Sequence, residues 1–469
     1  MLPGPVCVSL TPTTVEEVFS APPPGADCLE VRLDYLRNPE ESTSARWSRL
    51  PIPVIATCRG RDRGGRFEGS IEDEIRILER AVSNGARFVD IDFRFARPFG
   101  KAEVIGSHHD FGKTPENLET LMDEVSRSPG AVAKLATMVR SWNDNRRLLE
   151  LLNRNWGKPV IVIGMGPMGQ ITRIVGPSRG SALTYTASGP GSAPGQVSLE
   201  ELVGTYRFPK VHGSTSLIGI IGKPLGHSRS PVLHNQGFED VGLDFVYLKL
   251  PVDSVADFFE NANEIGIRGF SVTIPHKVDV IEHLDQLSPA AEQAGAVNTV
   301  VRDNGRWVGD NTDVHGIAQS LSGFNPRGKH VVILGTGGAA RAAVTALGSA
   351  ARITLLSRDP DRVPATWPRG VDVGRLENVA DYAADLLINA TPIGMAPNVN
   401  QAPMSGRIRA DVVFDMVYNP ARTLLLREAA TQGKKTIAGT TMFLAQAAKQ
   451  FEIWTGRRAP ETIFGVESS

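Results

Sequence analysis

The sequence predicts an α/β protein in two parts, an N-terminal (β/α)8 barrel followed by a two-lobed α/β unit with a Rossmann-type nucleotide domain. Two observations lead to this prediction. Short apolar, β-branched runs alternate with helical stretches over roughly the first 200 residues, which is typical of a (β/α)8 barrel. Further on, a strand-like run leads into a glycine-rich turn and an alanine-rich stretch, which is typical of a dinucleotide-binding βα unit.

The two parts meet between Val203 and Ser230. This joint is short, contains proline and glycine and is not of low complexity, so it predicts a limited set of relative orientations without a long tether. The expected bounds are 1–208 for the barrel, 209–216 for the linker, 217–315 plus about 440–469 for one lobe of the second unit (217–469), and 316–439 for its nucleotide-binding lobe.

The composition is that of an ordinary soluble protein. Of the 469 residues, 41% are hydrophobic and 22% are charged. The formal net charge of -1 does not indicate electrostatic attraction to nucleic acid or to an anionic membrane. No apolar run reaches about 18 residues and no leader is evident, so we expect a cytoplasmic protein with small-molecule partners. Cys7, Cys28 and Cys58 lie in apolar runs, which indicates buried thiols and no metal site.

Charged residues are unusually dense at the expected C-terminal ends of the barrel strands, where such folds place their sites. Glu30, Arg32 and Asp34 alternate with period two, so they project to one face of the second strand; a buried salt-bridge ladder is the alternative. The charged positions are Glu30, Arg32, Asp34, Arg59, His109, Lys134 and Arg173.

Lys134 lies among small apolar residues in the run AVAKLAT. Burial there would lower the pKa of the amine and make it a nucleophile toward a ketone, whereas the alternative is an amine that reaches solvent at the strand end. The run SHHDF offers a candidate general base one strand away, and only one of His108 and His109 can point inward.

The motifs that stand in order along the first half are Glu30–Asp34 (EVRLD), Thr57–Arg59 (TCR), Ser107–Pro115 (SHHDFGKTP), Lys134, Ile171–Arg173 (ITR) and Ser192–Gln196 (SAPGQ). With these motifs the first half resembles the type I 3-dehydroquinate dehydratases over nearly its full length. The resemblance implies that Lys134 forms a Schiff base with the substrate ketone, and that His109 removes the C2 proton and returns a proton to the leaving hydroxyl. It also implies that Arg173 binds the substrate carboxylate. The residues that would position the ring and its hydroxyls are Glu30, Arg32, Arg59, Ser192 and Gln196.

One position departs from that family, which usually has a glutamate four residues after the arginine that corresponds to Arg59. Here Arg63 stands there, preceded by Asp62. A carboxylate beside His109 would orient the imidazole and raise its pKa. We hypothesise that Asp62 takes this role while Arg63 turns to solvent; the alternative is a solvated loop in which neither residue touches His109.

The run GMGPMG, 164–169, matches the glycine pattern of a dinucleotide site, but Pro167 and the lack of an acid about 20 residues later argue against one. We expect it to form the loop after the seventh barrel strand, with Met165 and Met168 lining the substrate site or packing.

The run VVILGTGGAARA, 331–342, is a stronger fingerprint, because its glycines let backbone amides approach a pyrophosphate at a helix N-terminus. The next strand ends at Ser357 and Arg358, where NAD enzymes place an acid. Arg358 and Arg362 suit a ribose 2′-phosphate, so NADP is favoured over NAD. Asp359 weakens this prediction, and a solvated loop carrying both arginines is the alternative.

Further motifs of the second half are Ser228–Ser230 (SRS), Ser271–Lys277 (SVTIPHK), Gly295–Thr299 (GAVNT), Gly309–Asp313 (GDNTD), Asn389–Pro392 (NATP), Tyr418–Pro420 (YNP) and Met442–Gln446 (MFLAQ). With them this half resembles shikimate dehydrogenase across essentially its whole length. The resemblance implies that Lys277 and Asp313 donate a proton to the C3 carbonyl oxygen as hydride arrives from NADPH.

The same resemblance implies that Ser228 and Ser230 hold the carboxylate. The residues that would bind hydroxyls or close the cleft are Thr273, Asn298, Tyr418 and Gln446. The expected cofactor-binding residues are Gly335, Gly337, Gly338, Ala339, Ser357, Arg358, Arg362, Asn389, Thr391 and Gly439. Taken singly, Asn298 and Asn389 could be turn residues and the two serines could cap a helix.

Together the halves predict a bifunctional enzyme that dehydrates 3-dehydroquinate to 3-dehydroshikimate and reduces the latter to shikimate with NADPH, as a monomer or weak homodimer without metal. One alternative is a quinate dehydrogenase in the second half, against which the pair Ser228 and Ser230 argues modestly. Another is a non-catalytic, metabolite-sensing regulator. The presence of Lys134, His109, Lys277 and Asp313 argues against this regulator.

Overall fold

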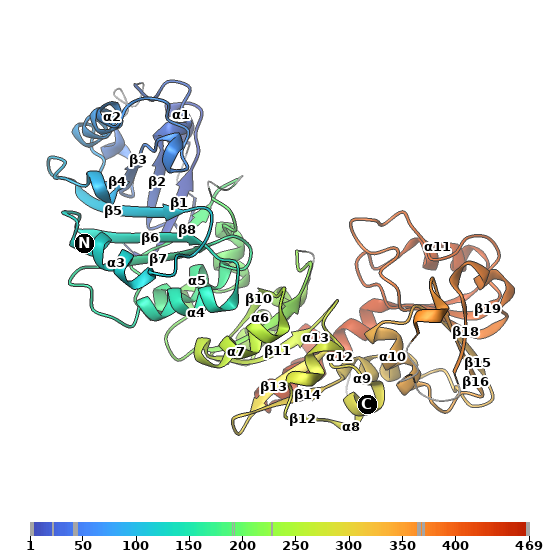
Figure 1. The fold of residues 1–469 in the computed structure, drawn as a ribbon. Helices are drawn as coiled ribbons and strands as arrows, with labels where there is room; N and C mark the ends of the chain where they lie inside the picture. The colour runs from blue at the N-terminus through green and yellow to red at the C-terminus, as the bar shows by residue number, and fades with distance from the viewer. Residues whose placement is uncertain are drawn as a thin grey trace. The chain divides into compact units, whose positions relative to one another are not determined.

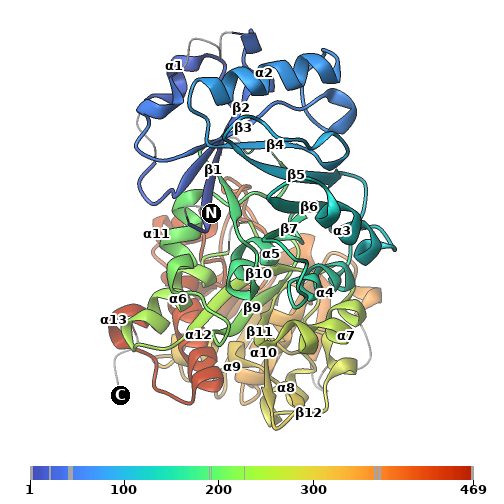
Figure 2. The ribbon, with the colours of Figure 1, turned by 90° about the vertical axis from the view of Figure 1, so that its left-hand side faces the viewer.

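The computed structural model describes residues 4–20, 23–40, 46–189, 191, 193–226, 228–363, 367 and 371–465. Its internal contacts divide the chain into two compact units, Met1–Leu217 with Asp244–Ile267, and Ile218–Leu243 with Arg268–Ser469. Figures 1 and 2 show their elements. The segment Asp244–Ile267, expected in the second unit, therefore clusters with the first, and the expected lobe bounds stay a prediction.

Eight parallel strands form the barrel of the first unit, one on each of the apolar runs (Figure 1). They are β1 (Val6–Leu10), β2 (Cys28–Arg32), β3 (Val54–Thr57), β4 (Phe88–Asp92), β5 (Glu103–Asp110), β6 (Val132–Met138), β7 (Val160–Met165) and β8 (Thr184–Ala187). Their order is β7-β6-β5-β4-β3-β2-β1-β8, and a bridge between Val160 and Ser181 links the two ends. The predicted barrel is confirmed.

The inward face of these strands changes character along their length. At period two, the first inward residues are apolar and fill the barrel, for example Cys28, Phe88 and Val132. Two positions further on, the same faces carry Glu30, Asp90 and Lys134, all buried. The C-terminal end of the barrel therefore holds polar groups on an apolar floor.

Helices cover the outside of the barrel, where the outward strand residues Val54 and Ala56 share a core with Ile77 and Leu78. The α-helices of this unit are α1 (Val15–Val18), α2 (Ile71–Ser83), α3 (Leu118–Arg127), α4 (Trp142–Leu151), α5 (Gln170–Val175) and, from the added segment, α7 (Val255–Ile265), which follows β10 (Phe245–Pro251). Cys7, Cys28 and Cys58 are free and buried, as expected.

The segment Asp244–Ile267 is joined to the barrel by α4. The carboxylate of Asp257 accepts hydrogen bonds from the backbone N–H groups of Trp142 (2.6 Å) and Asn143 (3.3 Å), and the Trp142 indole donates to the carbonyl of Pro251 at 3.0 Å. An acidic side chain at these first N–H groups of a helix is favourable because they have no partner within the helix.

The second unit contains two sheets. The first runs β9-β11-β13-β14-β12 within this unit, and the second runs β17-β16-β15-β18-β19-β20 with all of its pairs parallel. The strands of the first are β9 (Ser216–Gly222), β11 (Ile267–Val272), β12 (Gln286–Leu287), β13 (Thr299–Asp303) and β14 (Arg306–Asp310). Those of the second are β15 (His330–Leu334), β16 (Arg352–Ser357), β17 (Val371–Arg375), β18 (Ala384–Asn389), β19 (Ala410–Asp415) and β20 (Lys435–Ala438).

When the strands of the second sheet are numbered from β15 in chain order, their spatial order is 3-2-1-4-5-6. This is the strand order of dinucleotide-binding folds. Ligands of such sheets bind where the order reverses, here between the C-terminal ends of β15 and β18. The predicted Rossmann-type domain is confirmed. The α-helices of this unit are α6 (Ser230–Asp240), α8 (Pro289–Ala294), α9 (Thr312–Ser320), α10 (Gly338–Ala346), α11 (Leu424–Thr431), α12 (Gly439–Thr455) and α13 (Glu461–Phe464).

The long helix α12 returns from the second sheet to the first. The Gln450 amide donates to the carbonyl of Asn298 at 3.2 Å and to the Thr299 hydroxyl at 3.0 Å, and the Trp454 indole donates to the carbonyl of Val300 at 3.0 Å. No helix among the described residues is long and apolar enough to span a membrane.

Candidate active sites

A cavity opens at the C-terminal end of the barrel, where the polar inward residues lie. It is lined by Glu30, Arg32, Arg59, His109, Phe111, Lys134, Ala136, Ile163, Met165, Arg173, Tyr185, Ala193 and Gln196. Its volume is about 40 Å³. Phe111 is the exposed residue of this lining.

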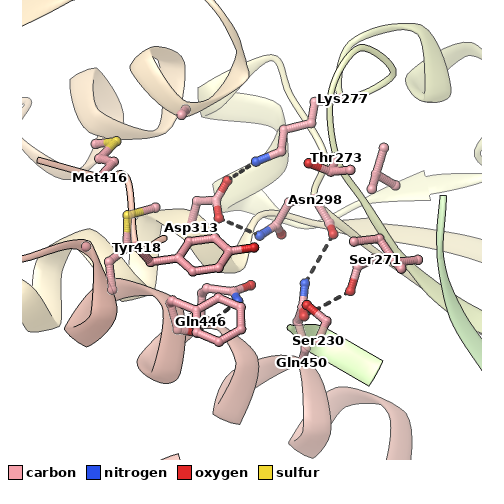
Figure 3. A pocket seen from close by; sticks show the side chains of 16 residues that line it. Ser230, Ser271, Thr273, Lys277, Asn298, Asp313, Met416, Tyr418, Gln446 and Gln450 are labelled. Carbon is pink, nitrogen blue, oxygen red and sulfur yellow. Dashed lines mark hydrogen bonds and ion pairs between the residues drawn. The ribbon is translucent and has the colours of Figure 1, made fainter. Parts of the chain in front are cut away.

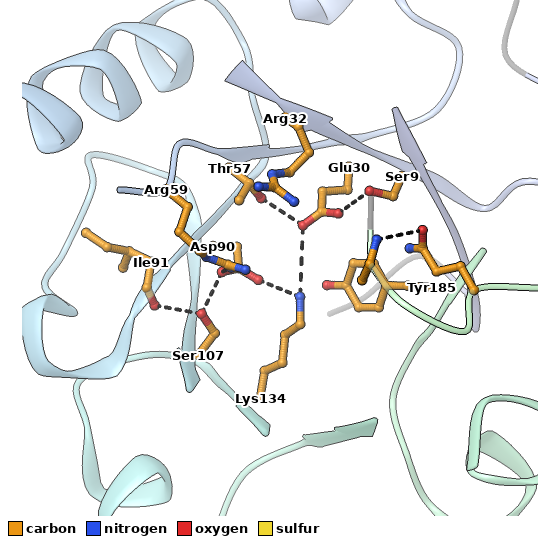
Figure 4. A network of polar contacts seen from close by, with 12 residues as sticks. Ser9, Glu30, Arg32, Thr57, Arg59, Asp90, Ile91, Ser107, Lys134 and Tyr185 are labelled. Atoms are coloured by element: carbon orange, nitrogen blue, oxygen red, sulfur yellow. Dashed lines mark hydrogen bonds and ion pairs between the residues drawn. The ribbon is translucent and has the colours of Figure 1, made fainter. Parts of the chain in front are cut away.

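Lys134 is buried at the centre of this site (Figure 4). Its Nζ lies 2.8 Å from Asp90 Oδ2, 3.9 Å from Glu30 Oε1, and 3.8 Å from the centre of the Tyr185 ring. The sequence predicted a buried lysine among apolar residues; the structure adds a carboxylate partner that the sequence analysis missed. The alternative of an amine that reaches solvent is wrong, because the side chain is 5% exposed.

Asp90 joins three polar groups of the barrel. Its Oδ1 accepts hydrogen bonds from Arg59 Nη2 (2.8 Å) and the Ser107 hydroxyl (2.7 Å), while Oδ2 accepts from Lys134. Burial opposes the charge, but Lys134 and Arg59 outweigh it and hold the pKa of Asp90 well below its usual range. The signal for Asp90 was an acid in the middle of the apolar run FVDIDF.

His109 is the histidine that lines the cavity, whereas the ring of His108 packs edge-on against Phe93. The His109 ring stacks on Phe111, with centroids 6.0 Å apart. Burial and the cations Arg59 and Lys134 lower the pKa of His109 well below its ordinary value, although Asp90 opposes the shift. His109 is therefore neutral and able to accept a proton near neutral pH.

The hypothesis about Asp62 and Arg63 is wrong. Arg63 is turned inward with 13% of its side chain exposed, and its Nη2 donates to the buried Glu74 at 2.6 Å. Asp62 is 70% exposed and pairs with Arg63 at 3.2 Å. Burial raises the pKa of Glu74 to about 7, and Arg63 opposes this shift. The carboxylate that interacts electrostatically with His109 is Asp90.

Arg173 was expected at a strand end but lies in α5, after β7, and still lines the cavity. Among the described residues, its guanidinium donates only to the carbonyls of Tyr185 (3.2 Å) and Pro194 (3.5 Å), and its Nε has no partner. Burial lowers the pKa of Arg173 to about 10. A buried cation without a carboxylate partner suits an anionic ligand.

The other predicted residues of this site have protein partners. Arg32 pairs through two nitrogens with Asp34, at 2.9 and 2.7 Å, and Glu30 accepts from the hydroxyls of Ser9 (2.5 Å) and Thr57 (3.0 Å). For Arg32 and Asp34, the alternative of a buried salt bridge is therefore correct. Gln196 lines the cavity, and Ser192 lies outside the described residues. The run 164–169 was expected to be a loop, but Gly164 and Met165 end β7 and the turn begins at Gly166; Met165 lines the cavity, as expected.

A second cavity, of about 170 Å³, lies in the second unit (Figure 3). It is lined by Ile220, Ser230, Ser271, Val272, Thr273, Lys277, Asn298, Asp313, Ala339, Met416, Tyr418, Gly439, Met442, Phe443, Gln446 and Gln450. The lining comes from β9 and β11 of the first sheet, from α10 and the segment after β19 on the side of the second sheet, and from α12, so the cavity lies between the two lobes.

Lys277 and Asp313 form an ion pair on the wall of this cavity, with Lys277 Nζ 2.5 Å from Asp313 Oδ2. The other carboxylate oxygen accepts from the Asn298 amide at 2.8 Å. The Asn298 amide oxygen in turn accepts from the backbone N–H of Thr312 at 2.8 Å, at the start of α9. Asn298 thus holds Asp313 toward Lys277 and is more than a turn residue.

The remaining predicted binding residues of this unit lie around the pair. Ser230, Thr273, Tyr418 and Gln446 line the cavity, with the Tyr418 ring stacked on Phe443 at 4.3 Å. Ser228 is absent from the lining, but its hydroxyl accepts from the backbone N–H of Ser230 (3.4 Å) and shares a hydrogen bond with Tyr418. Neither serine is the N-cap of α6, which is Arg229.

Ser271 and Gln450 were missed by the sequence analysis. They line the cavity and their side chains are hydrogen bonded at 3.0 Å. Their signals were polar residues at buried positions, Ser271 at the end of a strand and Gln450 one helical turn after Gln446.

The predicted nucleotide turn follows β15. Gly335 has a φ of +105°, which favours glycine, and a Cβ there would lie 3.1 Å from Thr391 Cγ2. At Gly337, the N-cap of α10, a Cβ would meet no atom within 4 Å. At Gly338, a Cβ would lie 2.8 Å from Lys277 Cδ. Open space over a helix N-terminus fits a pyrophosphate, and the third glycine lets the helix approach Lys277.

The other expected cofactor residues take different positions. Arg358 is exposed, and the Ser357 hydroxyl donates to the carbonyl of Asp359 at 3.1 Å. Asn389 is fully buried, and its amide oxygen accepts from the backbone N–H (3.0 Å) and hydroxyl (2.6 Å) of Thr391, so it shapes that turn. Ala339 and Gly439 line the cavity. Arg362 ends a 3-10 turn, and its side chain lies outside the described part of the structure.

Within the described ranges, no group of three or more His, Cys, Asp or Glu residues is placed to hold a metal ion.

Comparisons with known proteins agree with this two-part architecture. A family model described as type I 3-dehydroquinase matches residues 6–212. Models described as the shikimate dehydrogenase substrate binding domain and the shikimate 5'-dehydrogenase C-terminal domain match residues 220–300 and 439–464.

The similar proteins include one that spans both parts. The bifunctional 3-dehydroquinate dehydratase/shikimate dehydrogenase, chloroplastic, of Arabidopsis thaliana is 33% identical over 500 residues, covering 98% of this chain and 83% of that protein. The shikimate dehydrogenase (NADP(+)) of Oleidesulfovibrio alaskensis is 42% identical over 255 residues, covering 52% of this chain and 91% of that protein. The crystal structure of shikimate dehydrogenase 1 from Peptoclostridium difficile is 32% identical with a TM-score of 0.51, covering 53% of this chain and 95% of that one.

Proposed function

Because the chain belongs to the family of bifunctional 3-dehydroquinate dehydratase/shikimate dehydrogenases, we propose that the barrel cavity is the dehydratase site and the second cavity the dehydrogenase site. The enzyme removes water from 3-dehydroquinate to give 3-dehydroshikimate and then reduces this product to shikimate. The observation that carries the proposal is that each cavity brings together the catalytic pair expected for its reaction.

In the barrel, Lys134 attacks the substrate ketone and forms a Schiff base, which acts as an electron sink for the adjacent carbon. His109, kept neutral by its surroundings, takes the C2 proton and returns a proton to the leaving hydroxyl. Arg173 binds the substrate carboxylate with its guanidinium, of which Nε has no partner among the described residues. Glu30, Arg32, Arg59, Ser192 and Gln196 position the ring.

In the second unit, Lys277 and Asp313 supply the proton for the carbonyl oxygen that becomes the new hydroxyl. Ser228 and Ser230 bind the carboxylate. The residues that bind the hydroxyls or close the cavity are Thr273, Asn298, Tyr418 and Gln446. Their hydroxyl and amide groups match a polyhydroxylated ring.

NADP is the proposed cofactor of this unit, and when bound it supplies the hydride. The glycine turn after β15 and the start of α10 would hold its pyrophosphate, and Arg358 its 2′-phosphate. The name of the Oleidesulfovibrio relative, which includes NADP(+), supports this assignment. A cytoplasmic location and a monomeric or weakly dimeric state remain proposals as well.

Reciprocal variants test the two sites. Lys134→Ala should abolish dehydration and leave the reduction of 3-dehydroshikimate near normal, because the lysine touches only the barrel cavity. Lys277→Ala should lower kcat for reduction by about 10²-fold or more and leave dehydration unchanged. The two initial rates are measured separately on each variant. Loss of both activities in either variant, or a change confined to KM in Lys277→Ala, contradicts the assignment.

Borohydride reduction in the presence of substrate identifies the nucleophile. The expected result is a covalent adduct on the peptide that carries Lys134, found by mass spectrometry. The Lys134→Ala variant is the control and should yield none. An adduct on any other lysine overturns the role of Lys134.

A further inference from the structure

We infer that Asp90 positions Lys134 for the dehydration and is the counter-ion of the iminium that this lysine forms. The inference rests on the proposed function of Lys134. It adds to the site a carboxylate that is part of no motif used to predict the reaction.

The geometry holds the Asp90 carboxylate rigidly. The residue lies in the middle of β4 and is fully buried. One oxygen is fixed by Arg59 and Ser107, which leaves the other directed at Lys134 Nζ, 2.8 Å away (Figure 4). Glu30 is further from Nζ, at 3.9 Å, and is itself held by the hydroxyls of Ser9 and Thr57. Asp90 is therefore the carboxylate that directs the amine.

The charge at the lysine nitrogen is conserved when the Schiff base forms. An ammonium group and a ketone give a protonated iminium and water: the C–N double bond replaces the C–O double bond, and the oxygen leaves with two of the three ammonium protons. The nitrogen keeps one N–H and one positive charge. Asp90 thus faces the same charge before and after condensation, and the remaining N–H, donated to Asp90 Oδ2, fixes the plane of the C=N bond.

The next step moves this charge within reach of the same carboxylate. When His109 takes the C2 proton, the electron pair of the C–H bond shifts toward the nitrogen, so the nitrogen becomes neutral and the imidazole becomes positive. Asp90 interacts electrostatically with both Lys134 and His109. In a buried site, a cation without such a partner is costly, so one fixed carboxylate serves both states.

Asp90→Asn tests this inference, because it removes the charge and keeps the shape. We expect kcat for dehydration to fall by about 10²-fold or more with a smaller change in KM, and adduct formation at Lys134 under borohydride to slow in parallel. The acidic limb of the pH profile should move to lower pH, because Asp90 is the group that raises the pKa of His109 while Arg59, Lys134 and Arg32 lower it.

Asp92→Asn is the matched control. Asp92 lies two residues further along β4, pairs with Arg94 and is not among the residues that line the cavity. This variant should retain wild-type dehydration. Reduction of 3-dehydroshikimate should be unchanged in both variants and serves as an internal control in the same chain.

The outcomes separate this inference from the proposed function. A wild-type adduct on a lysine other than Lys134 overturns the proposed function. An adduct on Lys134 together with a wild-type kcat and pH profile in Asp90→Asn overturns only the role of Asp90.

Should circular dichroism show that Asp90→Asn does not fold, Ser107→Ala replaces it, because it removes one hydrogen bond to Asp90 Oδ1 and keeps every charge. A several-fold fall in kcat at unchanged KM is then expected. An unchanged kcat rejects the inference.

Discussion

His109 lies among cations and one carboxylate, and this environment sets the pH at which it can accept a proton. Burial, Arg59, Lys134 and Arg32 all lower its pKa well below the ordinary value of 6.5, and Asp90 only partly opposes them. A general base works in its deprotonated form, so a lowered pKa extends activity toward acid. We expect the acidic limb of kcat/KM for dehydration to lie below pH 6.5, measured as a pH-rate profile.

The Asp62→Asn variant is the control for this profile, since Asp62 is 70% exposed and pairs with Arg63. It should leave the acidic limb in place. A limb at or above pH 6.5, or one that moves in Asp62→Asn, would show that His109 is not the neutral base described here.

Contacts between residues that are distant in the chain could not be predicted from the sequence. In the run FVDIDF, the period of two places Asp90 on the opposite face of the strand from Val89. The period does not place Asp90 beside Lys134, which is 44 residues away and comes close to it because both strands belong to the barrel. For the same reason the partner of Arg63 could not be predicted: Glu74 reaches it from α2. Pairing across elements depends on register and burial, which a local pattern does not contain.

Among the elements, the start of α10 is the one that connects cofactor and catalysis. A Cβ on Gly338 would lie 2.8 Å from Lys277 Cδ and 2.9 Å from its Cβ, so the stem of the lysine would have to move. A small displacement of a catalytic group can cost about 10²-fold in rate. Gly338→Ala should therefore lower kcat for reduction about 10-fold or more. Gly338 has no positive φ, so alanine adds no backbone strain there and the unfolding temperature should change little.

Gly348→Ala, just after the same helix, is the control. A Cβ at Gly348 would meet its nearest atom at 3.6 Å, an ordinary contact, and activity should be retained. If Gly338→Ala has wild-type kcat, the close approach of α10 to Lys277 is not part of the site.

The positions of the barrel strands were predicted well from the sequence. Each barrel strand forms on a predicted apolar run, because an inward and an outward apolar face give a continuous β-branched pattern. Arg173 is the exception, since the short run that carries it begins a helix after the tight turn at Gly166 and Gly169. A few residues beside glycines do not distinguish a strand from a helix.

For the whole molecule, motif order predicted two catalytic units in one chain. It did not predict that Asp244–Ile267 would cluster with the barrel. The contacts responsible, such as the Trp142 indole to the carbonyl of Pro251, join residues more than a hundred positions apart and leave no local pattern.

Oxidation of NADPH by the purified chain, with 3-dehydroquinate as the only substrate, requires both proposed sites to work in sequence. We predict a steady loss of NADPH, because the barrel must first produce the ketone that the second unit reduces. No loss of NADPH with 3-dehydroquinate, alongside rapid loss when 3-dehydroshikimate is added, would contradict the dehydratase half of the account.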